Sequence, residues 1–342
     1  MTRQFLEIVL LGDSVSWSNQ LPYGQRYADF IEAELQERFG ETTLVDVAAC
    51  GDGGNTAEEG LARIERDCIA YSPHAVVISF GTNDACRGLS RDRFMRSYRT
   101  LVEKAARDTG ALVVLETLPT LDEERHSFRN SPQAFMYGGL EKYLEQYSHS
   151  HVREISRTHK LPLHERFAIY HQEKKADPAA GGRLILPDGA HFTREGNRFF
   201  AHTLVDLLYP VLSKNEPRRS SDAAHWLDRA GTNVVYLEAC AALETGKLAG
   251  MMTNQMLPVR LMLQQCRSFA RRAYAYAEDP KMAGETLAVE RLATGFLAAQ
   301  RAYAPFNDEA RRGSAEWGIE QLKECTHPLA AKLRETLNAL AA

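Results

Sequence analysis

Residues 10–17 read LLGDSVSW and join an apolar run to an amphipathic segment. The apolar run, Ile8–Leu11, ends at Gly12, and the segment Tyr23–Phe39 has the periodicity of a helix. This order predicts a strand, a tight turn and a helix, with Ser14 in the turn. In a parallel α/β sheet, ligands bind outside the carboxyl ends of the strands, which is where Ser14 would lie.

Apolar runs continue to alternate with helical patterns up to about residue 212. Four more strands are expected, at 43–48, 75–80, 111–116 and 161–169, with helices between them and a closing helix to residue 212. Five strands separated by helices predict a doubly wound three-layer α/β domain with a parallel sheet. The stretch 118–139 has neither the apolar run of a strand nor the periodicity of a helix, and polar residues alternate with aromatic ones in it. Loops of this length are usually functional lids or disordered.

The alternation stops at about residue 213. Residues 214–221 are polar, contain a proline and read as a linker. From 222 to 342 the sequence has only helical periodicity, which predicts an all-α helical bundle. One of its apolar stripes consists of Met262, Cys266, Phe269 and Ala273. We therefore expect an α/β domain at 1–213, a linker at 214–221 and a helical domain at 222–342. The role of the helical domain stays open between lid, dimerisation element and partner-binding surface.

Composition and charge narrow the classes of partner. The 342 residues are 44% hydrophobic and 25% charged, as in a soluble globular protein, and the formal net charge is -4. No basic stripe suggests nucleic acid, and no apolar segment reaches the ~18 residues of a membrane span. The six cysteines lie far apart. Because the apolar part of the N-terminus is too short for a signal peptide, we expect a cytoplasmic protein with reduced thiols.

Two further segments follow predicted strands at the same edge of the sheet as Ser14. In the glycine-dense loop 51–56, a glycine can serve only a turn with positive φ, or the N–H of Gly54 can point toward a carbonyl that Ser14 attacks. In Gly81-Thr82-Asn83-Asp84, the asparagine can cap a helix or shape a turn. Its side-chain amide is also well placed to complete an oxyanion hole.

Asp188 and His191 are the last elements of this pattern. A lone histidine is more often structural than catalytic, and a serine at a strand–helix junction is often only a helix cap. Here a carboxylate three residues before the histidine can accept from Nδ1–H, which leaves Nε2 basic toward Ser14. A serine hydroxyl needs a base and an oxyanion trap to act as a nucleophile. The four segments together therefore indicate nucleophilic catalysis.

In this combination the chain resembles the GDSL/SGNH hydrolase family. The likeness covers about residues 5–212, and the family's four blocks are matched by Gly12-Asp13-Ser14, Gly54, Gly81-Thr82-Asn83-Asp84 and Asp188-Gly189-Ala190-His191. The segment Gly54–Arg63 is similar to that of the family's bacterial thioesterase/lysophospholipase branch. The chain departs from the family at Ala49, where many members carry asparagine, and in its helical segment after residue 220.

The resemblance implies a flavodoxin-like α/β/α fold with a parallel five-stranded sheet. It implies hydrolysis of a small-molecule acyl ester or thioester, with Ser14 as nucleophile, His191 as base and Asp188 as the residue that orients it. The N–H groups of Ser14 and Gly54 and the Asn83 side chain would form the oxyanion hole, and no cofactor or metal is expected. Two alternatives stay open. One is an acyltransferase that passes the acyl group to an alcohol or amine, and the other is a catalytically idle scaffold whose helical domain binds a partner protein or forms a homo-oligomer.

A cluster of histidines allows a metal-site interpretation. The cluster consists of His149, His151, His159, His164 and His171. A metal site needs ligands on one face with defined geometry, and His-x-His on a helix points its two rings apart. A solvated helix without a metal is therefore the favoured interpretation.

Overall fold

The computed structural model of the chain describes residues 4–118, 123–214, 223–241 and 259–298, together with 327–338 apart from 333 and 337. Its strands are β1 (Gln4–Gly12), β2 (Thr43–Gly51), β3 (Ala75–Ser79), β4 (Leu112–Thr117) and β5 (Leu163–Glu165). They form a five-stranded sheet in the order β2-β1-β3-β4-β5, and each neighbouring pair is parallel. This is the strand order of flavodoxin-like folds, which confirms the predicted fold class.

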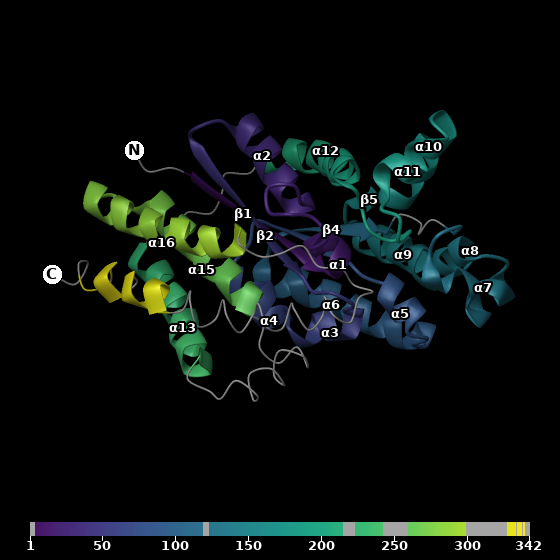
Figure 1. The fold of residues 1–342 in the computed structure, drawn as a ribbon, viewed down its shortest axis with the longest axis horizontal. Coiled ribbons are helices and arrows are strands. Elements are labelled where there is room, and N and C mark those ends of the chain that lie inside the picture. Colours follow the sequence, from purple (N-terminus) through teal and green to yellow (C-terminus); the bar gives the residue numbers. More distant parts are fainter. Residues whose placement is uncertain are drawn as a thin grey trace.

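Helices cover both faces of the sheet. α2 (Tyr27–Phe39) and α12 (Arg194–Leu212) pack on one face and lie above the strands in Figure 1, whereas α3 (Ala57–Ala62) and α6 (Arg91–Thr109) pack on the other. Alternate residues of β1 enter the two cores, as the side-chain period of a strand requires. The shorter helical segments are α1 (Ser14–Trp17), α4 (Ile64–Asp67), η1 (Ile69–Tyr71), α5 (Thr82–Cys86), η2 (Ser127–Asn130), α7 (Pro132–Tyr137), α8 (Leu140–Leu144), η3 (Glu145–His149), α9 (Ser150–His159), α10 (Arg166–Ala176) and α11 (Ala180–Leu184).

The register of the strands brings three chain segments to one level. Gly12 at the end of β1 pairs with Gly51 of β2 on one side and with Ser79 of β3 on the other. The residues that follow these strands therefore emerge side by side at the carboxyl edge. β1 and β3 also flank the point where the strand order reverses, which is where ligands bind in open α/β sheets.

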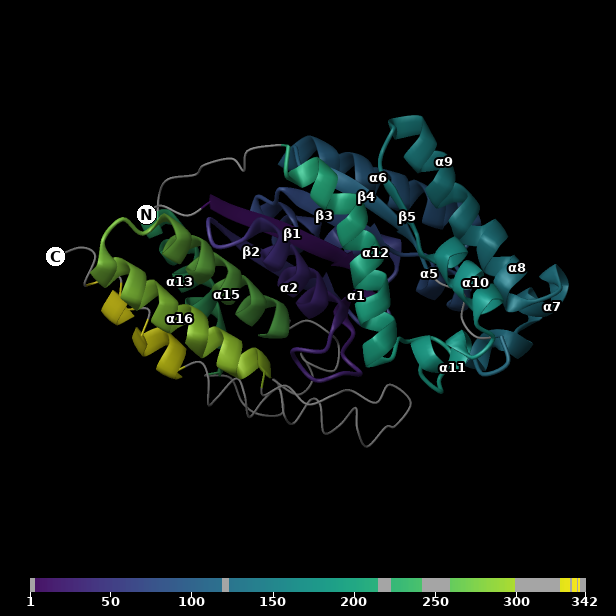
Figure 2. The ribbon, with the colours of Figure 1, turned by 90° about the horizontal axis from the view of Figure 1, so that it is seen from above.

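The region after residue 222 packs against the sheet through α15 (Val259–Tyr276). The other helices in its described part are α13 (Ala223–Ala241) and α16 (Pro280–Ala298), which pack on α15, and residues 327–332 are also helical. α15 contacts β1 and β2, and Figure 2 shows it alongside these strands. Its Phe269 packs on Tyr71 and on Trp226 of α13, with ring centroids 5.6 and 5.5 Å apart. The predicted stripe of Met262, Cys266, Phe269 and Ala273 is buried in this core, which the helices share with the sheet.

A buried group of charges joins α15 to the sheet. Asp46 of β2 accepts hydrogen bonds from Ser268 at 2.5 Å and from Arg271 at 3.2 Å, and it pairs with Arg267 at 3.3 Å. Both arginines also bind Glu32 of α2. Burial by itself would raise the pKa of Asp46, but the two guanidinium groups hold it below its ordinary value. Because loss of one member would leave a buried charge without its partner, this group ties α15 firmly to the sheet.

The predicted loop at 118–139 contains helical structure. Residues 119–122 lie outside the described part, and the rest includes η2 and α7. Ser131 caps α7 by accepting from the N–H of Ala134, and Pro132 occupies the first turn. Both are usual signals for the start of a helix, and they explain why this segment is not a simple loop.

The fifth strand is shorter than the predicted 161–169. β5 ends at Glu165, and α10 begins at the next residue. Arg166, the first residue of α10, is fully buried and pairs with Glu116 of β4 at 2.6 Å. The chain must turn inward to make this contact, which ends the strand at its edge position.

The predicted domain boundaries remain predictions. α12 ends at Leu212 and α13 begins at Ala223. Residues 215–221 of the predicted linker lie outside the described part of the chain. The helix-rich region beyond the sheet is present, as the periodicity indicates.

Candidate active site

Ser14 and His191 meet at the carboxyl edge of the sheet. Ser14 opens α1, and Asp13 caps this helix by accepting from the N–H of Val15 at 2.9 Å. The Oγ of Ser14 lies 2.9 Å from Nε2 of His191, although the two residues are 177 positions apart in the chain. His191 is buried and Ser14 is half-buried. At this separation the hydroxyl can pass its proton directly to the imidazole.

Asp188 orients the imidazole. Its Oδ2 lies 2.8 Å from Nδ1 of His191, and its Oδ1 accepts from the backbone N–H groups of Ala190 and His191. Burial by itself would raise the pKa of Asp188, but the hydrogen bonds and the charge of His191 hold it well below its ordinary value. The carboxylate therefore stays ionised and favours the tautomer with its proton on Nδ1. The lone pair of Nε2 then faces Ser14.

The end of β2 and the loop after it lie against the Ser14 turn. A Cβ atom on Gly51 would be 2.3 Å from the carbonyl oxygen of Asp13 and 2.7 Å from the backbone nitrogen of Trp17, so only glycine allows this contact. Gly54 has a φ of +76°, which other residues rarely adopt. Apart from its two chain neighbours, no atom of the described residues lies within 4 Å of its Cβ position. Backbone conformation, rather than crowding by neighbouring protein atoms, therefore explains the glycine at 54.

Asn83 contacts both the segment that leads to Ser14 and the loop that carries Gly54. Its Nδ2, in α5, donates to the Asp13 carboxylate at 2.9 Å and to the carbonyl of Asn55 at 3.2 Å. Both amide hydrogens are thus engaged, and donation to an oxyanion requires one of these bonds to be exchanged. Burial raises the pKa of Asp13 to about 6, although the hydrogen bond from the N–H of Val15 acts to lower it. Nothing in the sequence spacing predicts the contact between Asp13 and Asn83.

Arg63 fastens the ends of β1 and β2 to the loop that carries Gly54. Its Nη2 donates to the carbonyl of Gly12 and its Nη1 to that of Cys50, both at 2.7 Å, and its Nε donates to Oδ1 of Asn55 at 2.8 Å. These contacts fix the backbone on both sides of the loop. The chemistry of the motifs does not single out this arginine. Its one signal in the sequence is its place at the end of the Gly54–Arg63 segment.

Three of the clustered histidines are buried, so the prediction of a solvated helix is wrong for them. His149, His151 and His164 are each at most 2% exposed. His149 packs on Phe167 with ring centroids 4.7 Å apart, and Nδ1 of His164 lies 2.8 Å from Glu116. Burial lowers the pKa of all three histidines. The physical reason is packing: η3, which ends at His149, packs on α6, α9 packs against β4, and β5 belongs to the sheet, so these side chains point inward.

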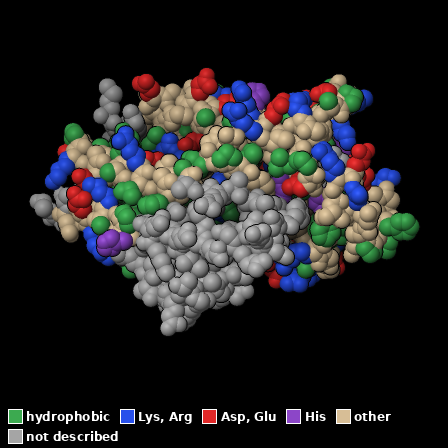
Figure 3. Space-filling view, in the orientation of Figure 1, with side chains coloured by type: hydrophobic (Ala, Val, Ile, Leu, Met, Phe, Trp, Pro, Cys, Tyr) green, Lys and Arg blue, Asp and Glu red, His purple; other side chains and the backbone are tan. Residues whose placement is uncertain are grey.

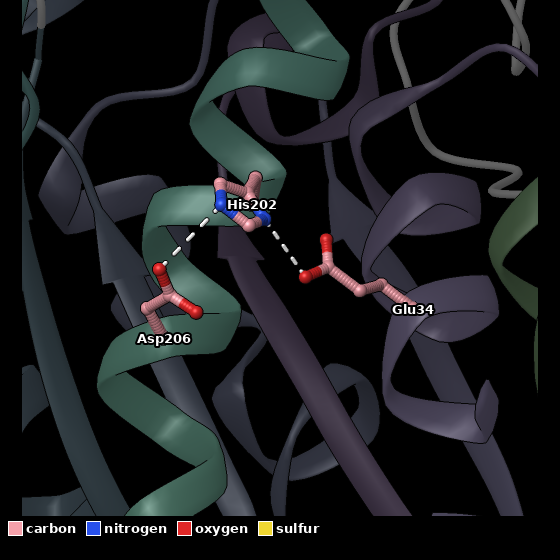
Figure 4. Close-up of side chains that lie close together, drawn as sticks. All are labelled: Glu34, His202 and Asp206. Carbon is pink, nitrogen blue, oxygen red and sulfur yellow. Dashed lines mark hydrogen bonds and ion pairs between the residues drawn. The ribbon is translucent and has the colours of Figure 1, made fainter. Parts of the chain in front are cut away.

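A different group of side chains is the one place in the described residues where metal-ligand atoms cluster. It consists of Glu34, His202 and Asp206. Figure 4 shows His202 between the two carboxylates, with Nδ1 2.9 Å from Glu34 and Nε2 3.6 Å from Asp206. Arg38 pairs with both carboxylates, at 2.5 and 2.6 Å. The arginine already neutralises these acids, so the group forms an ion-pair network between α2 and α12 rather than a free ligand set.

Exposed apolar side chains gather on α7. Phe135 is 87% and Met136 is 72% exposed, and Figure 3 shows hydrophobic side chains over α7 at the right-hand end of the molecule.

The segment that precedes α7, with His126, adjoins the site. Burial lowers the pKa of His126 to about 4, and the charges of Asp188 and His191 also act on it. None of the described helices is long and apolar enough to cross a membrane.

The fold and this constellation of side chains define an SGNH-type hydrolase. The sequence model of the GDSL-like Lipase/Acylhydrolase family matches residues 10–199, which is more than half of the 342 residues. The chain belongs to this family. It is therefore a carboxylic ester hydrolase of the esterase/lipase type.

The chain is also similar to individual proteins. The chain is 24% identical over 225 residues to the uncharacterized lipoprotein YqeF of Bacillus subtilis, covering 60% of this chain and 90% of that protein. It is 28% identical over 109 residues to an arylesterase of Vibrio mimicus and 29% identical over 108 residues to esterase TesA of Pseudomonas aeruginosa. Each of these two matches covers 32% of this chain and 52% of the relative.

Among solved structures, the lipase/acylhydrolase from Enterococcus faecalis matches with a TM-score of 0.48 and 22% sequence identity. The match covers 63% of this chain and 100% of that chain. One of the curated relatives is named a lipoprotein, so the cytoplasmic location expected from the sequence stays a prediction.

Proposed function

We propose that Ser14 is the nucleophile of this ester hydrolase, with His191 as general base and Asp188 as its orienting partner. In the first half-reaction, Oγ of Ser14 attacks the acyl carbonyl while Nε2 of His191 takes the hydroxyl proton. The bond from the acyl carbon to the leaving alcohol oxygen then breaks, and the same nitrogen returns the proton to that oxygen. The acyl group remains on Ser14 as an ester.

Water completes the reaction in the second half. Nε2 of His191 takes a proton from water, and the hydroxide oxygen attacks the acyl carbonyl. The bond to Oγ of Ser14 breaks, and the protonated imidazole gives its proton back to this oxygen. The products are the carboxylic acid and the free enzyme, so the balance requires only the ester and water.

The N–H groups of Ser14 and Gly54 and the side chain of Asn83 would hold the negative oxygen that forms in both halves. This assignment is supported by the strand register, since the segments after β1, β2 and β3 all emerge at one level. The contacts with Asp13 and with the loop carbonyl of Asn55 hold the Asn83 amide at this edge, and Asn83 would exchange one of these two bonds for the oxyanion. One such donor contributes about 3–4 kcal/mol to the transition state.

The proposal depends above all on the uninterrupted hydrogen bonding from Ser14 through His191 to Asp188. The two separations are 2.9 and 2.8 Å. A purely structural histidine needs a partner for each nitrogen, but it does not need a half-buried serine hydroxyl at the carboxyl edge of the sheet. The combination therefore favours a working nucleophile over an idle scaffold.

We further propose that the substrate is a small-molecule acyl ester or thioester. The names of the arylesterase and of esterase TesA support an ester. The same acyl-enzyme could be intercepted by an alcohol or amine, which would make the protein an acyltransferase. Product analysis with a competing acceptor separates the two activities, and a panel of esters and thioesters of graded chain length determines the preferred bond.

The Ser14→Ala variant tests the proposal directly. We expect it to lose hydrolysis of a small activated ester and labelling by a fluorophosphonate while the melting temperature stays close to that of the wild type. Ser16→Ala, a buried serine in the same helix, is the matched control and should keep both. Full activity of the Ser14→Ala variant would overturn the assignment. A wild-type chain that resists the fluorophosphonate would indicate an idle scaffold.

A further inference from the structure

Arg260 connects the helical region to the site. It lies in the first turn of α15, and its Nη1 donates to the carbonyl of Ala49 at 2.7 Å, while its Nη2 donates to the carbonyl of Gly51. The guanidinium also lies over the ring of Trp17, 4.1 Å from the centroid. Trp17 is the last residue of α1, the helix that Ser14 opens. One side chain from the helical region thus touches two of the segments that build the site.

The strand order explains why an arginine is suited to this place. Within the described part of the chain, β2 is the edge strand and pairs with β1 alone, so the carbonyls on its outer side have no strand partner there. Ala49 and Gly51 are two residues apart, so their carbonyls point to the same side. A guanidinium presents several N–H groups in a planar fork and can therefore bind both carbonyls at once, which a lysine ammonium does less well.

The strand end that Arg260 binds is also the one that supports the Ser14 turn. Gly51 lies directly against Asp13 and Trp17, where no Cβ atom fits, and the N–H of Asp52 donates to the carbonyl of Gly12 at 3.1 Å. Arg63, the residue between α3 and α4, holds the same strand ends. The carboxyl end of β2 is therefore held by two arginines, Arg63 from the α/β region and Arg260 from the helical region.

We infer that Arg260 is a positioning residue of the esterase site, which fixes the end of β2 and Trp17 so that the Gly54 and Ser14 N–H groups keep their places. The inference rests on the proposed function, since it assumes that these N–H groups bind the oxyanion. It gives the helical region a part in catalysis without contact with the substrate. When a change remote from the reacting atoms displaces a catalytic group by about 1 Å, the rate can fall ~10²-fold.

The test compares two arginines of α15. Arg272 is the matched control, because it also donates to backbone carbonyls, those of Tyr71 at 2.6 Å and Ser72 at 3.3 Å, and also stacks on a tryptophan, Trp226 at 4.0 Å. It lies twelve residues further along the helix, or about 18 Å from Arg260 at 1.5 Å per residue. Arg260→Met and Arg272→Met thus remove equivalent contacts at the site and away from it.

We expect Arg260→Met to lower kcat by ~10–100-fold with KM close to the wild-type value. Binding of a tetrahedral mimic, such as a trifluoromethyl ketone, should weaken by a similar factor. Arg272→Met should lower the melting temperature while the folded enzyme keeps its kcat. Arg260→Lys, which preserves the charge, should fold and give an intermediate kcat, so a misfolded Arg260→Met variant does not leave the question open.

Equal kcat values for the wild type, Arg260→Met and Arg260→Lys would overturn the inference. Equal losses of kcat in the Arg260→Met and Arg272→Met variants would also overturn it, since they would point to general stability. Ser14→Ala assayed in the same series keeps the two hypotheses apart. If Ser14→Ala is inactive and the Arg260 variants are fully active, only the positioning role falls. If Ser14→Ala is active, the proposed function itself falls.

Discussion

The carboxylate of Asp13 lies 2.9 Å from the side-chain nitrogen of Asn83, which is 70 positions away in the chain. The same carboxylate caps the helix that begins with Ser14. One acidic side chain therefore fixes both the start of that helix and the amide that we assign to the oxyanion hole. The geometry around Ser14 depends on this pair as well as on His191 and Asp188.

Replacement of Asn83 by alanine should mainly affect the chemical step. We expect kcat to fall by ~10²–10³ with KM little changed, because an oxyanion donor acts in the transition state. Steady-state kinetics with an activated ester measure this. Asn130→Ala, at an exposed position in η2, is the control and should leave kcat unchanged. An unchanged kcat in the Asn83→Ala variant would remove Asn83 from the oxyanion hole.

Asp188→Asn should impair the base without removing the imidazole. The amide cannot hold the proton on Nδ1 as the carboxylate does, so we expect kcat to fall by ~10⁴. Asp206→Asn is the control, because Asp206 also lies beside a histidine, His202, but on the surface. It should keep full activity. Equal activity of the two variants would contradict the role of Asp188.

The pKa of Asp188 also predicts a pH dependence of stability. Its folded pKa is held well below the ordinary value of 3.8, so its contribution is fully present above about pH 4 and is lost as the pH falls toward the folded pKa. The unfolding free energies of the wild type and of Asp188→Asn should differ by ~2 kcal/mol at pH 6. Urea denaturation should show this difference narrowing at pH 3. A difference that widens toward acid pH would contradict the assignment.

The backbone at Gly54 predicts a cost for any side chain. Because φ is +76°, Gly54→Ala should lower the unfolding free energy by ~1–2 kcal/mol and lower kcat as the loop shifts. Gly182→Ala is the matched control, since this glycine lies in α11 with open space around its Cβ position. The control should be neutral or slightly stabilising. Denaturant titration of both variants measures the difference.

The charges around Asp46 predict that the helical region is needed for stability. Arg267→Met leaves Asp46 buried without one of its partners and should cost ~3–5 kcal/mol of unfolding free energy. Arg183→Met, which removes a partly exposed arginine paired with Glu173 and Glu195, should cost no more than ~1 kcal/mol. Chemical denaturation of the two variants provides the comparison. Similar losses would contradict the strong coupling between α15 and the sheet.

The sheet, its flanking helices and the site segments could be predicted because each depends on a local pattern. A buried parallel strand such as β3 is a short apolar run between turn signals, and Asp188 precedes His191 by only three residues. Glycines mark the positions where the chain must turn or approach closely, as Gly54 and Gly51 show. These signals need no knowledge of distant contacts.

The predictions that were wrong depended on contacts between distant parts of the chain. β5 ends early because Arg166 pairs with Glu116. His149 and His151 are buried because their helical segment packs against the rest of the domain, in part against β4. The contact of Arg260 with β2 joins residues more than 200 positions apart and follows no motif. Such features depend on how separate elements pack, which periodicity alone does not specify.

The core shared by α15 and the sheet also affects how the protein is made. All five strands are synthesised before α15, and at ~5–20 residues per second the residues from 213 to 276 take several seconds to follow. During this interval the face of the sheet around Phe5 and Asp46 has no cover from α15, although both side chains are buried in the finished protein. The nascent chain therefore exposes an apolar sheet face during these seconds, and we expect co-expressed chaperones to raise its yield in a cell.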